Sequence, residues 1–370
     1  MKVNIDIRSN HKVRAFYLFF IISSLQIGVG IIGAPKYIFK EAQQDSWLSI
    51  LIATIYIIIV VFAMIFILEQ YESADIFGIQ VDVFGQWIGK LLGIIYIAHF
   101  IITLFSILIT YTEVIQIFLF PSLPTFIIPL LMMSLAVYSV QGGFKIIVGV
   151  AFLCFITTQW ILLFLYDPIT RMEWHHFTPM FQASLPELLA GARQTTYSFL
   201  GFHILFLVYP FIDNKKEVTR PAMLGVIFTG FVVFVTHVIA IGYFSKPDLL
   251  EAEWATLVLF KSISLPFLDR LDYLIVAEWM MVLLPNFTLL MWGITYGTKR
   301  LFNVSQRKTL YTIAILLTVA ASFVKYENQI ITVTDFVSTI GFWLIFIYPL
   351  LLLPIVFIKK KWQQKKEGSP

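Results

Sequence analysis

Glycine interrupts two long apolar stretches of this chain, and these interruptions constrain the fold more than any other feature. The first interruption spans residues 28–35, with the letters GVGIIGAP, and the second spans residues 197–203, with the letters YSFLGFH. In hydrocarbon, backbone groups released from a helix find no water, so such breaks persist only where protein buries them or where they line a cavity. Interrupted segments at corresponding places in two halves of a membrane protein indicate a transporter-type binding site.

The composition indicates a membrane protein. The 370 residues are 59% hydrophobic and 16% aromatic, only 13% of them are charged, and the mean hydropathy is +0.85. An ordinary soluble domain has about 25% charged residues. We therefore predict an integral membrane protein with all-α structure, because its apolar stretches have the length of membrane-spanning helices.

Ten stretches are apolar and long enough to cross about 30 Å of hydrocarbon as helices. They lie at 15–40, 47–68, 86–117, 124–140, 144–166, 187–212, 221–244, 271–296, 310–324 and 334–358. We expect one membrane domain over residues 1–370, with five helices in 1–166, five in 187–358 and a basic cytoplasmic tail at 359–370. The two glycine interruptions then fall in the first and sixth helices.

The basic residues predict the orientation. If both termini are cytoplasmic, most of the 26 Lys and Arg lie on the cytoplasmic side, as the positive-inside rule favours. These residues cluster at 2–14, 215–220, 299–308 and 359–366. The net charge of +4 then reflects contact with lipid, and we expect no nucleic-acid partner. A basic run beside a helix is typical of an anchor to anionic lipid.

The sequence favours no enzymatic function. It has no recognisable arrangement of nucleophile, base and orienting group, and no phosphate-binding loop. His175 and His176 are adjacent in a predicted outer loop, which is too little to predict a metal site. We expect no catalytic residue, no metal and no cofactor.

Several motifs together resemble one family, the spore-germination permeases. Besides the first interruption, these motifs are Gln44-Asp45-Ser46-Trp47-Leu48, Leu200-Gly201-Phe202, Tyr209-Pro210-Phe211, Arg270-Leu271-Asp272 with Trp279, and Pro349 to Pro354 before the Lys run. The resemblance covers essentially the whole chain. These permeases are the B subunits of bacterial nutrient germinant receptors, and they are related to the amino acid-polyamine-organocation transporters.

The resemblance implies a fold, a location and partners. The fold would be five plus five helices in inverted repeat, with the first and sixth helices unwound at mid-membrane. The location would be the bacterial cell membrane, specifically the spore inner membrane. The partners would be a larger A subunit and a C subunit that is a lipoprotein. The ligand would be a small-molecule nutrient, such as an amino acid.

Helix ends at the breaks suit a zwitterionic ligand, because one end presents backbone N–H groups and the other presents carbonyls. By resemblance, Gly28, Gly30, Ile31 and Gly33 would face a carboxylate, while Ser198, Phe199 and Gly201 would face an ammonium group. Apolar side chains at Ile31, Leu200 and Phe342 favour a small aliphatic amino acid such as alanine. A receptor for a sugar or a nucleoside is also compatible with these residues. Glycines can also serve helix packing alone.

Other candidate ligand contacts lie on later helices. His203 stands where related transporters often have an acid, which argues against a cationic substrate and simple proton coupling. In the third helix Tyr96, His99, Phe100 and Thr103 share one face, because they are spaced three and four residues apart. That face is a candidate wall of the cavity, and ordinary packing is the alternative. Glu278 is intramembrane, which by default indicates function.

Two functions remain open. The chain is either a receptor subunit whose occupancy shifts a conformation that partner subunits detect, or an ion-coupled amino acid transporter; fold alone does not separate them. Sodium-coupled relatives place hydroxyl groups of the eighth helix opposite carbonyls of the first, and here Thr288 is the obvious candidate. Lys145 is a candidate fixed cation in place of sodium, or a membrane anchor. The resemblance favours the receptor.

Overall fold

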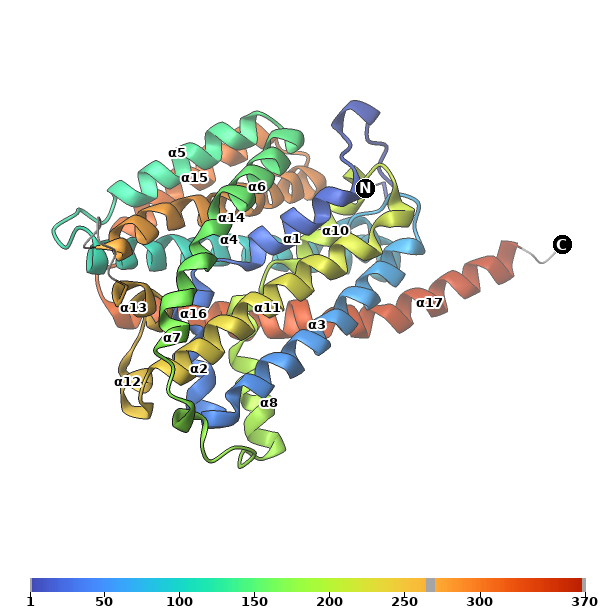
Figure 1. Ribbon diagram of the computed structural model, residues 1–370. Helices are drawn as coiled ribbons and strands as arrows, with labels where there is room; N and C mark the ends of the chain where they lie inside the picture. The colour runs from blue at the N-terminus through green and yellow to red at the C-terminus, as the bar shows by residue number, and fades with distance from the viewer. Residues whose placement is uncertain (1, 264–269, 368–370) are drawn as a thin grey trace.

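The computed structural model describes residues 2–263 and 270–367, and over these residues the chain is a bundle of helices (Figure 1). The helices of the first half are α1 (Leu18–Gln26), α2 (Gly30–Ala42), α3 (Ser46–Glu69), α4 (Ile76–Phe118), α5 (Ile127–Gln141), α6 (Phe144–Thr158) and α7 (Tyr166–Thr170). Those of the second half are α8 (Leu185–Gln194), α9 (Thr196–Phe199), α10 (Leu205–Val208), α11 (Thr219–Tyr243), α12 (Lys246–Glu251), α13 (Ala255–Lys261), α14 (Leu271–Phe302), α15 (Gln306–Ser322), α16 (Glu327–Gly341) and α17 (Tyr348–Glu367).

Length and hydropathy identify six helical segments in the described part of the chain that are able to cross a membrane. They are Gly30–Glu69, Ile76–Phe118, Phe144–Thr170, Lys215–Tyr243, Leu271–Phe302 and Glu327–Gln363. Three shorter apolar segments, Ala15–Gln26, Ile127–Gln141 and Thr196–Phe211, accompany them. The multi-pass, all-helical class is therefore confirmed, whereas the number ten and the division at residues 166 and 187 stay predictions.

Both glycine interruptions are real breaks in helices. Between α1 and α2, Ile27 is extended, with φ −76° and ψ 103°. After α9, Leu200 is extended and Gly201 has φ +132°, a conformation that favours glycine. The chain then resumes in short helical turns from Phe202 to Phe211. Each interrupted stretch thus consists of two half-helices, as the sequence predicts.

Pro35 does not contribute to the first break, because it lies inside α2. Proline has no N–H, so it leaves the carbonyl four residues earlier without its helical partner. That carbonyl belongs to Ile31, and the hydroxyl of Thr256 in α13 donates to it at 2.9 Å. The second half of the chain therefore supplies the hydrogen bond that Pro35 removes.

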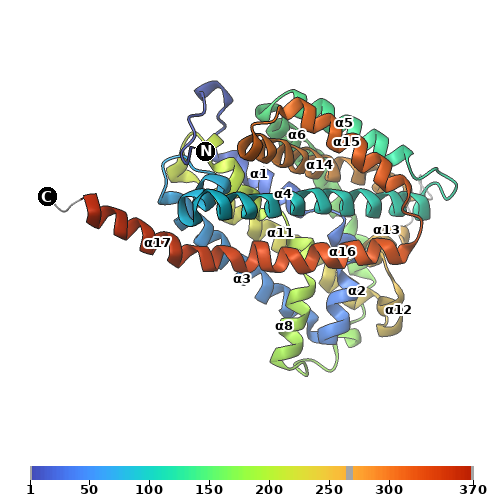
Figure 2. The same cartoon turned by 180° about the vertical axis from the view of Figure 1, so that it is seen from behind.

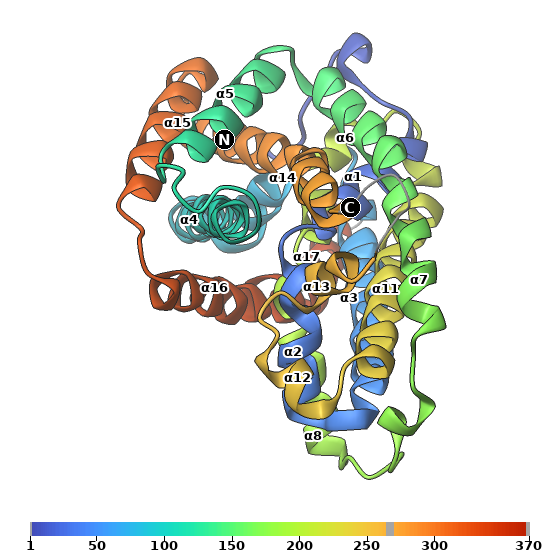
Figure 3. The same cartoon turned by 60° about the vertical axis from the view of Figure 1, so that its left-hand side comes forward.

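The core is centred on α14. This helix packs against α4, α5, α6 and α1, while α11 packs against α1 and α3. Figure 3 shows α4 between α14 and α16, with α2, α3, α8 and α11 in the other part of the bundle. The half-helices α2 and α8 lie against each other, so the halves of the chain meet near the breaks.

Both chain termini lie at the same end of the bundle, on the right in Figure 1 and on the left in Figure 2, and we call this the terminal end. Here Asp75 is fully buried and binds Arg300 of α14, with 2.7 Å between Oδ2 and Nε. The hydroxyl of Tyr296 donates to the same carboxylate at 2.6 Å. Arg300 also donates to the carbonyl of Lys2 at 3.0 Å, so this network fixes the N-terminal segment to the bundle.

Candidate ligand-binding site

The two breaks pack directly against each other through their glycines. A methyl group at Gly30 would lie 2.9 Å from the Cα atom of Ser198. A methyl group at Gly201 would lie 2.8 Å from the carbonyl carbon of Leu25. Each break therefore needs a glycine because the backbone of the other break approaches it. This reciprocal contact brings the two predicted clusters together.

Two buried amides stabilise the unwound segments. Gln26 donates its Nε2 to the carbonyl of Phe199 at 3.0 Å, which joins the end of α1 to the end of α9. Asn286 of α14 donates its Nδ2 to the carbonyl of Ser24 at 2.8 Å and to that of Ile27 at 3.2 Å. These carbonyls are the groups that the first break releases. Unsatisfied carbonyls are costly in hydrocarbon, so both amides replace hydrogen bonds that the helix loses.

His203 lies beside the second break, and it is buried without a hydrogen-bond partner among the described residues. Its ring stacks on Phe100, with 5.1 Å between ring centroids and 18° between the planes. Neither ring nitrogen has a partner, and the same holds for the Oε1 atom of Gln26. Buried polar atoms are normally satisfied. Unpaired polar atoms at one place therefore indicate that a polar molecule belongs there.

A small cavity lies beside the contact between the two breaks and is lined by residues of both. Its volume is about 20 Å³, and His203, Gln26 and Asn286 contribute to its wall. The remaining lining comes from Leu25, Gly28, Val29, Gly30, Thr103, Ile107, Tyr197, Leu200, Gly201 and Leu290. A water molecule needs roughly 10–15 Å³, so the cavity has room for water but is too small for an amino acid. The structure thus shows the breaks in a closed conformation.

A larger cavity of about 90 Å³ adjoins the breaks on the side of α12 and α13. Gly30 and Tyr197 line both cavities, and Ser198 lines the larger one. Four acidic side chains also line the larger cavity: Glu113, Glu253, Glu327 and Asp335. We call it the acidic vestibule. Its carboxylates favour a cationic group at the entrance to the breaks.

The four vestibule acids differ in their partners. Glu253 binds the ammonium group of Lys36 and the hydroxyl of Tyr37, so its charge is balanced within the vestibule. The ion pairs of the described residues include neither Glu113 of α4 nor Asp335 of α16. Glu327 of α16 is also absent from these ion pairs, so three vestibule carboxylates from the packed helices α4 and α16 remain available to a bound cation.

The predicted site residues fall into distinct groups. Gly28, Gly30, Leu200, Gly201 and His203 line the 20 Å³ cavity, and Gly30, Gly33 and Ser198 line the acidic vestibule. Ile31 faces a separate cavity of about 50 Å³ among α1, α6, α11 and α14. The structure therefore gathers the two glycine clusters and places Ile31 on another face of α2.

The other candidates lie behind the cavity walls. Phe199 and Tyr96 are fully buried, and the Tyr96 hydroxyl donates to the carbonyl of Leu344 at 3.4 Å. The Thr288 hydroxyl donates to Pro285 in its own helix at 3.0 Å, so it does not turn toward the first break. Phe342 lies under the guanidinium of Arg193, 5.3 Å from the ring centroid. These side chains surround the site without lining its cavities.

Two polar candidates, Lys145 and Glu278, lie away from the breaks. Lys145 is exposed at the start of α6. Glu278 accepts a hydrogen bond from the indole N–H of Trp160 at 2.6 Å and does not line the two cavities at the breaks. Neither residue contributes to the site described here.

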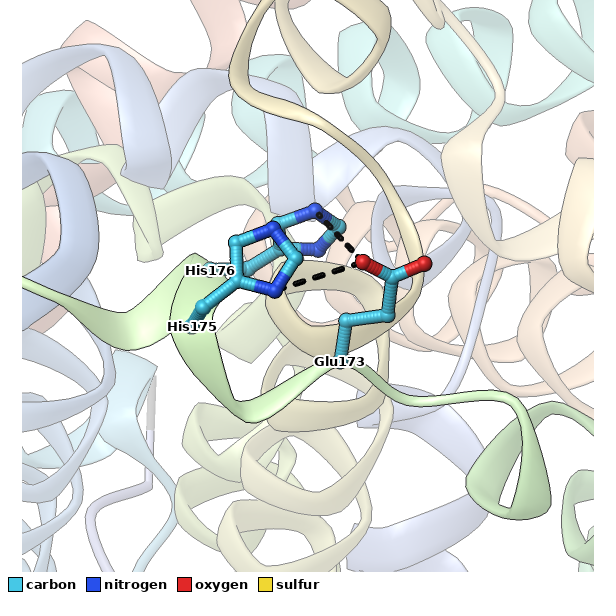
Figure 4. A group of neighbouring side chains, drawn as sticks. All are labelled: Glu173, His175 and His176. Carbon is cyan, nitrogen blue, oxygen red and sulfur yellow. Dashed lines mark ion pairs between the residues drawn. The ribbon is translucent and has the colours of Figure 1, made fainter.

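His175 and His176 lie near Glu173, with nitrogen-to-carboxylate distances of 3.3 Å and 3.8 Å (Figure 4). These are residue types that bind metals. However, Nδ1 of His176 is 2.9 Å from the carbonyl of Gly242, which explains its orientation. Contacts with Glu173 and with the carbonyl of Gly242 account for the arrangement of the two rings.

Comparison with known proteins identifies a family and several similar proteins. A family model described as "Spore germination protein" matches residues 12–330. Spore germination protein GerQB of Bacillus cereus is 29% identical over 348 residues, covering 94% of this chain and 95% of the relative. Spore germination protein B2 of Bacillus subtilis (strain 168) is 24% identical over 369 residues, covering 98% of each.

Two solved transporter structures share the fold. One is a Na⁺-coupled sialic acid symporter in a substrate-bound, outward-open state, with a TM-score of 0.63 and 13% identity, covering 95% of this chain and 78% of the symporter. The other is MhsT in complex with L-phenylalanine, with a TM-score of 0.59 and 15% identity, covering 96% of this chain and 89% of MhsT. At these identities the likeness concerns the fold alone.

Proposed function

Because this chain belongs to the spore germination protein family and has a transporter fold, we propose that it is a germinant-receptor subunit that binds a small nutrient. The observation that carries this proposal is the closed junction of the two breaks. Gly30 and Gly201 bring the broken helices into contact beside a cavity whose lining includes Gln26 and His203, two buried residues with unpaired polar atoms. A polar ligand that separates the breaks would satisfy these atoms and change the conformation.

An amino acid is the ligand class that the charges favour. The start of α2 presents backbone N–H groups and a positive dipole end, which suit a carboxylate. Glu113 and Asp335 in the acidic vestibule suit an ammonium group. The ammonium partners would then be vestibule carboxylates in addition to Ser198. The carbonyl of Phe199 is a weaker candidate, because Gln26 already donates to it.

Sensing is favoured over sodium-coupled transport by the hydrogen bonds at the first break. The Asn286 amide already donates to the carbonyls of Ser24 and Ile27, the kind of group that a sodium ion would need there. Thr288, the candidate hydroxyl ligand, donates to its own helix instead. The alternative remains an ion-coupled amino acid transporter, and the fold shared with a Na⁺-coupled symporter supports it.

The location and partners follow from the family. We propose that the chain resides in the spore inner membrane with the terminal end in the cytoplasm, because basic residues gather at that end. We also propose that it assembles with a germinant-receptor A subunit and a C lipoprotein subunit. Co-purification of the three chains from spore membranes tests this assembly, and isolation of the chain without either partner contradicts it.

Binding and flux measured together test the function. The purified chain in liposomes is given labelled amino acids, with and without a sodium gradient and at several pH values. Saturable binding without accumulation supports the receptor, whereas ion-driven accumulation supports the transporter. His203→Leu removes both ring nitrogens and should weaken binding about tenfold. His11→Leu, in the N-terminal segment, is the matched control and should bind normally.

A further inference from the structure

A wide cavity lies at the terminal end, and it shares no lining residue with the two cavities at the breaks. Its volume is about 1290 Å³. Cationic side chains from four parts of the chain line it: Lys2, Arg8, Lys90, Lys299, Arg300 and Arg307. Asp6 is the one acidic residue among its lining side chains in the described part of the chain. We call it the basic cavity.

Most of this positive charge is not balanced within the protein. Arg300 is the exception, since it is bound by buried Asp75. The ion pairs of the described side chains include none of the other five cations. The positive-inside rule explains why cations lie at one end of the bundle, but not why they converge on one concave surface. Such convergence focuses a positive potential that attracts anions.

The same cavity also has an apolar wall. Trp292 and Tyr296 stack with 5.1 Å between their ring centroids, and Phe144 contacts Trp292 at 4.7 Å. All three rings line the cavity, together with Leu301 and Leu310. A ligand that fits here therefore combines an anionic group with apolar parts.

Exposed apolar or aromatic side chains follow three of the lining residues in the sequence. Phe302 and Tyr311 are exposed, and each directly follows a lining residue, Leu301 or Leu310. Ile146 is also exposed, two residues after Phe144. In a membrane-spanning helix such exposed apolar side chains suit contact with acyl chains, which would bring a lipid headgroup close to the cavity. Basic pockets between membrane helices are known to bind lipid headgroups.

We propose that the basic cavity binds the phosphate headgroup of an anionic membrane lipid. The cations of the cavity pair with the phosphate, and the aromatic and aliphatic wall contacts the glycerol and the first acyl carbons. The bound lipid fastens the N-terminal segment to α14, because Lys2 and Arg8 of that segment and Lys299 of α14 all line the cavity. This site is independent of the nutrient site.

Lipid retention by the purified full-length chain tests the proposal. Native mass spectrometry counts phosphatidylglycerol and phosphatidylcholine molecules that remain bound after detergent exchange. The cavity variant is Lys299→Gln with Arg307→Gln, two exposed residues whose replacement leaves the core intact. The control is Lys308→Gln with Lys361→Gln, two exposed cations outside the cavity. Both variants lose two positive charges, so they differ in whether the lost charges line the cavity.

The proposal predicts selective retention of phosphatidylglycerol over phosphatidylcholine. Retention should fall roughly thirtyfold in the cavity variant, since two basic residues near an anionic lipid together contribute about 2 kcal/mol, and should persist in the control. Equal loss in the two variants, or no selectivity, overturns the proposal. If inorganic phosphate displaces the lipid at low millimolar concentration, the anion that the cavity binds is free phosphate and not a lipid headgroup. A polyglutamate peptide is the probe for an acidic protein segment. If it displaces the lipid and binds the cavity more tightly than the lipid does, the ligand of the cavity is an acidic protein segment and the lipid assignment is overturned.

Discussion

The side-chain amide of Asn286 donates to the carbonyl oxygen of Ser24 at 2.8 Å, which joins the continuous helix α14 to the last turn of α1. The same amide reaches Ile27 at 3.2 Å, so one side chain satisfies two carbonyls at the break. A methyl group at Gly28 would lie 3.2 Å from Oδ1 of Asn286. The glycine therefore gives the amide the room to reach the backbone.

The first prediction exchanges this amide for a carboxylate. Asn286→Asp places a negative oxygen beside two carbonyl oxygens. These oxygens repel one another, but together they are suitable ligands for a hard cation. We expect the melting temperature of Asn286→Asp to be lower than that of the wild type in choline chloride, and to rise when Na⁺ replaces choline. The measurement is thermal unfolding of the purified protein in the two salts.

Asn286→Ala is the control for this exchange, because it removes the donor without adding a ligand. It should be less stable than the wild type by about 1 kcal/mol, the size of a hydrogen bond in a membrane protein, and should show no sodium effect. If wild type and Asn286→Asp respond equally to Na⁺, the amide does not occupy the place of a cation.

The second prediction concerns the carbonyl of Ile31. Thr256→Val removes the hydroxyl that donates to this carbonyl and leaves it unpaired, which should lower the free energy of unfolding by about 1–3 kcal/mol. Pro35→Ala supplies a backbone N–H to the same carbonyl. The double variant should therefore lose much less stability than Thr256→Val alone. Chemical unfolding of all four proteins gives the coupling energy, and strictly additive effects would contradict the explanation.

The breaks were predictable because glycine clusters interrupt two apolar runs at corresponding places in the two halves of the chain. The sequence of Gly28 to Gly33 and of Leu200 to Gly201 places both breaks within a few residues of their observed positions. Pro35 was misleading, because its effect on α2 is compensated by Thr256, which lies more than 200 residues away. Such a long-range partner leaves no local signal.

The polar residues that organise the site were harder to predict. Gln26 and Asn286 are single amides in apolar runs, and an amide at such a position is ambiguous until its partner is known. The vestibule acids Glu113 and Asp335 come from helices α4 and α16, and their proximity depends on packing. Their common signal is a polar side chain within a membrane segment, which is costly and therefore informative.

The third prediction concerns the acidic vestibule. Glu113→Gln with Asp335→Asn removes two negative charges and keeps the shapes of both side chains. Affinity for a zwitterionic amino acid should fall at least about tenfold, because each charge-assisted hydrogen bond contributes roughly 1.5–3 kcal/mol. Affinity for the matching carboxylic acid without an amino group should not fall. Equilibrium binding of both ligands to the purified chain provides the measurement.

Glu251→Gln is the matched control for the vestibule, since Glu251 is an exposed acid of α12 that does not line the cavity. It should bind the amino acid as the wild type does. If the vestibule variant binds the zwitterion normally, its ammonium group lies elsewhere, and the carbonyls at the end of α9 become the better candidates.

The last prediction separates glycines that shape the junction from those that do not. Gly201→Ala should be strongly destabilising, because the residue has φ +132° and its methyl group would meet the backbone of Leu25 and Gln26 within 3 Å. Gly149→Ala in α6 is the control, since nothing lies within 4 Å of the added methyl group. It should be neutral or stabilising by up to about 1 kcal/mol, because alanine favours helix.

Thermal unfolding and nutrient binding together decide the meaning of this comparison. If Gly201→Ala loses both stability and nutrient binding, the closed junction is part of the native structure. If Gly201→Ala folds as stably as Gly149→Ala, the backbones at the breaks do not approach each other as closely as the reciprocal contact of Gly30 and Gly201 requires. The resting protein would then hold its breaks apart, and nutrient binding would close the junction instead of opening it.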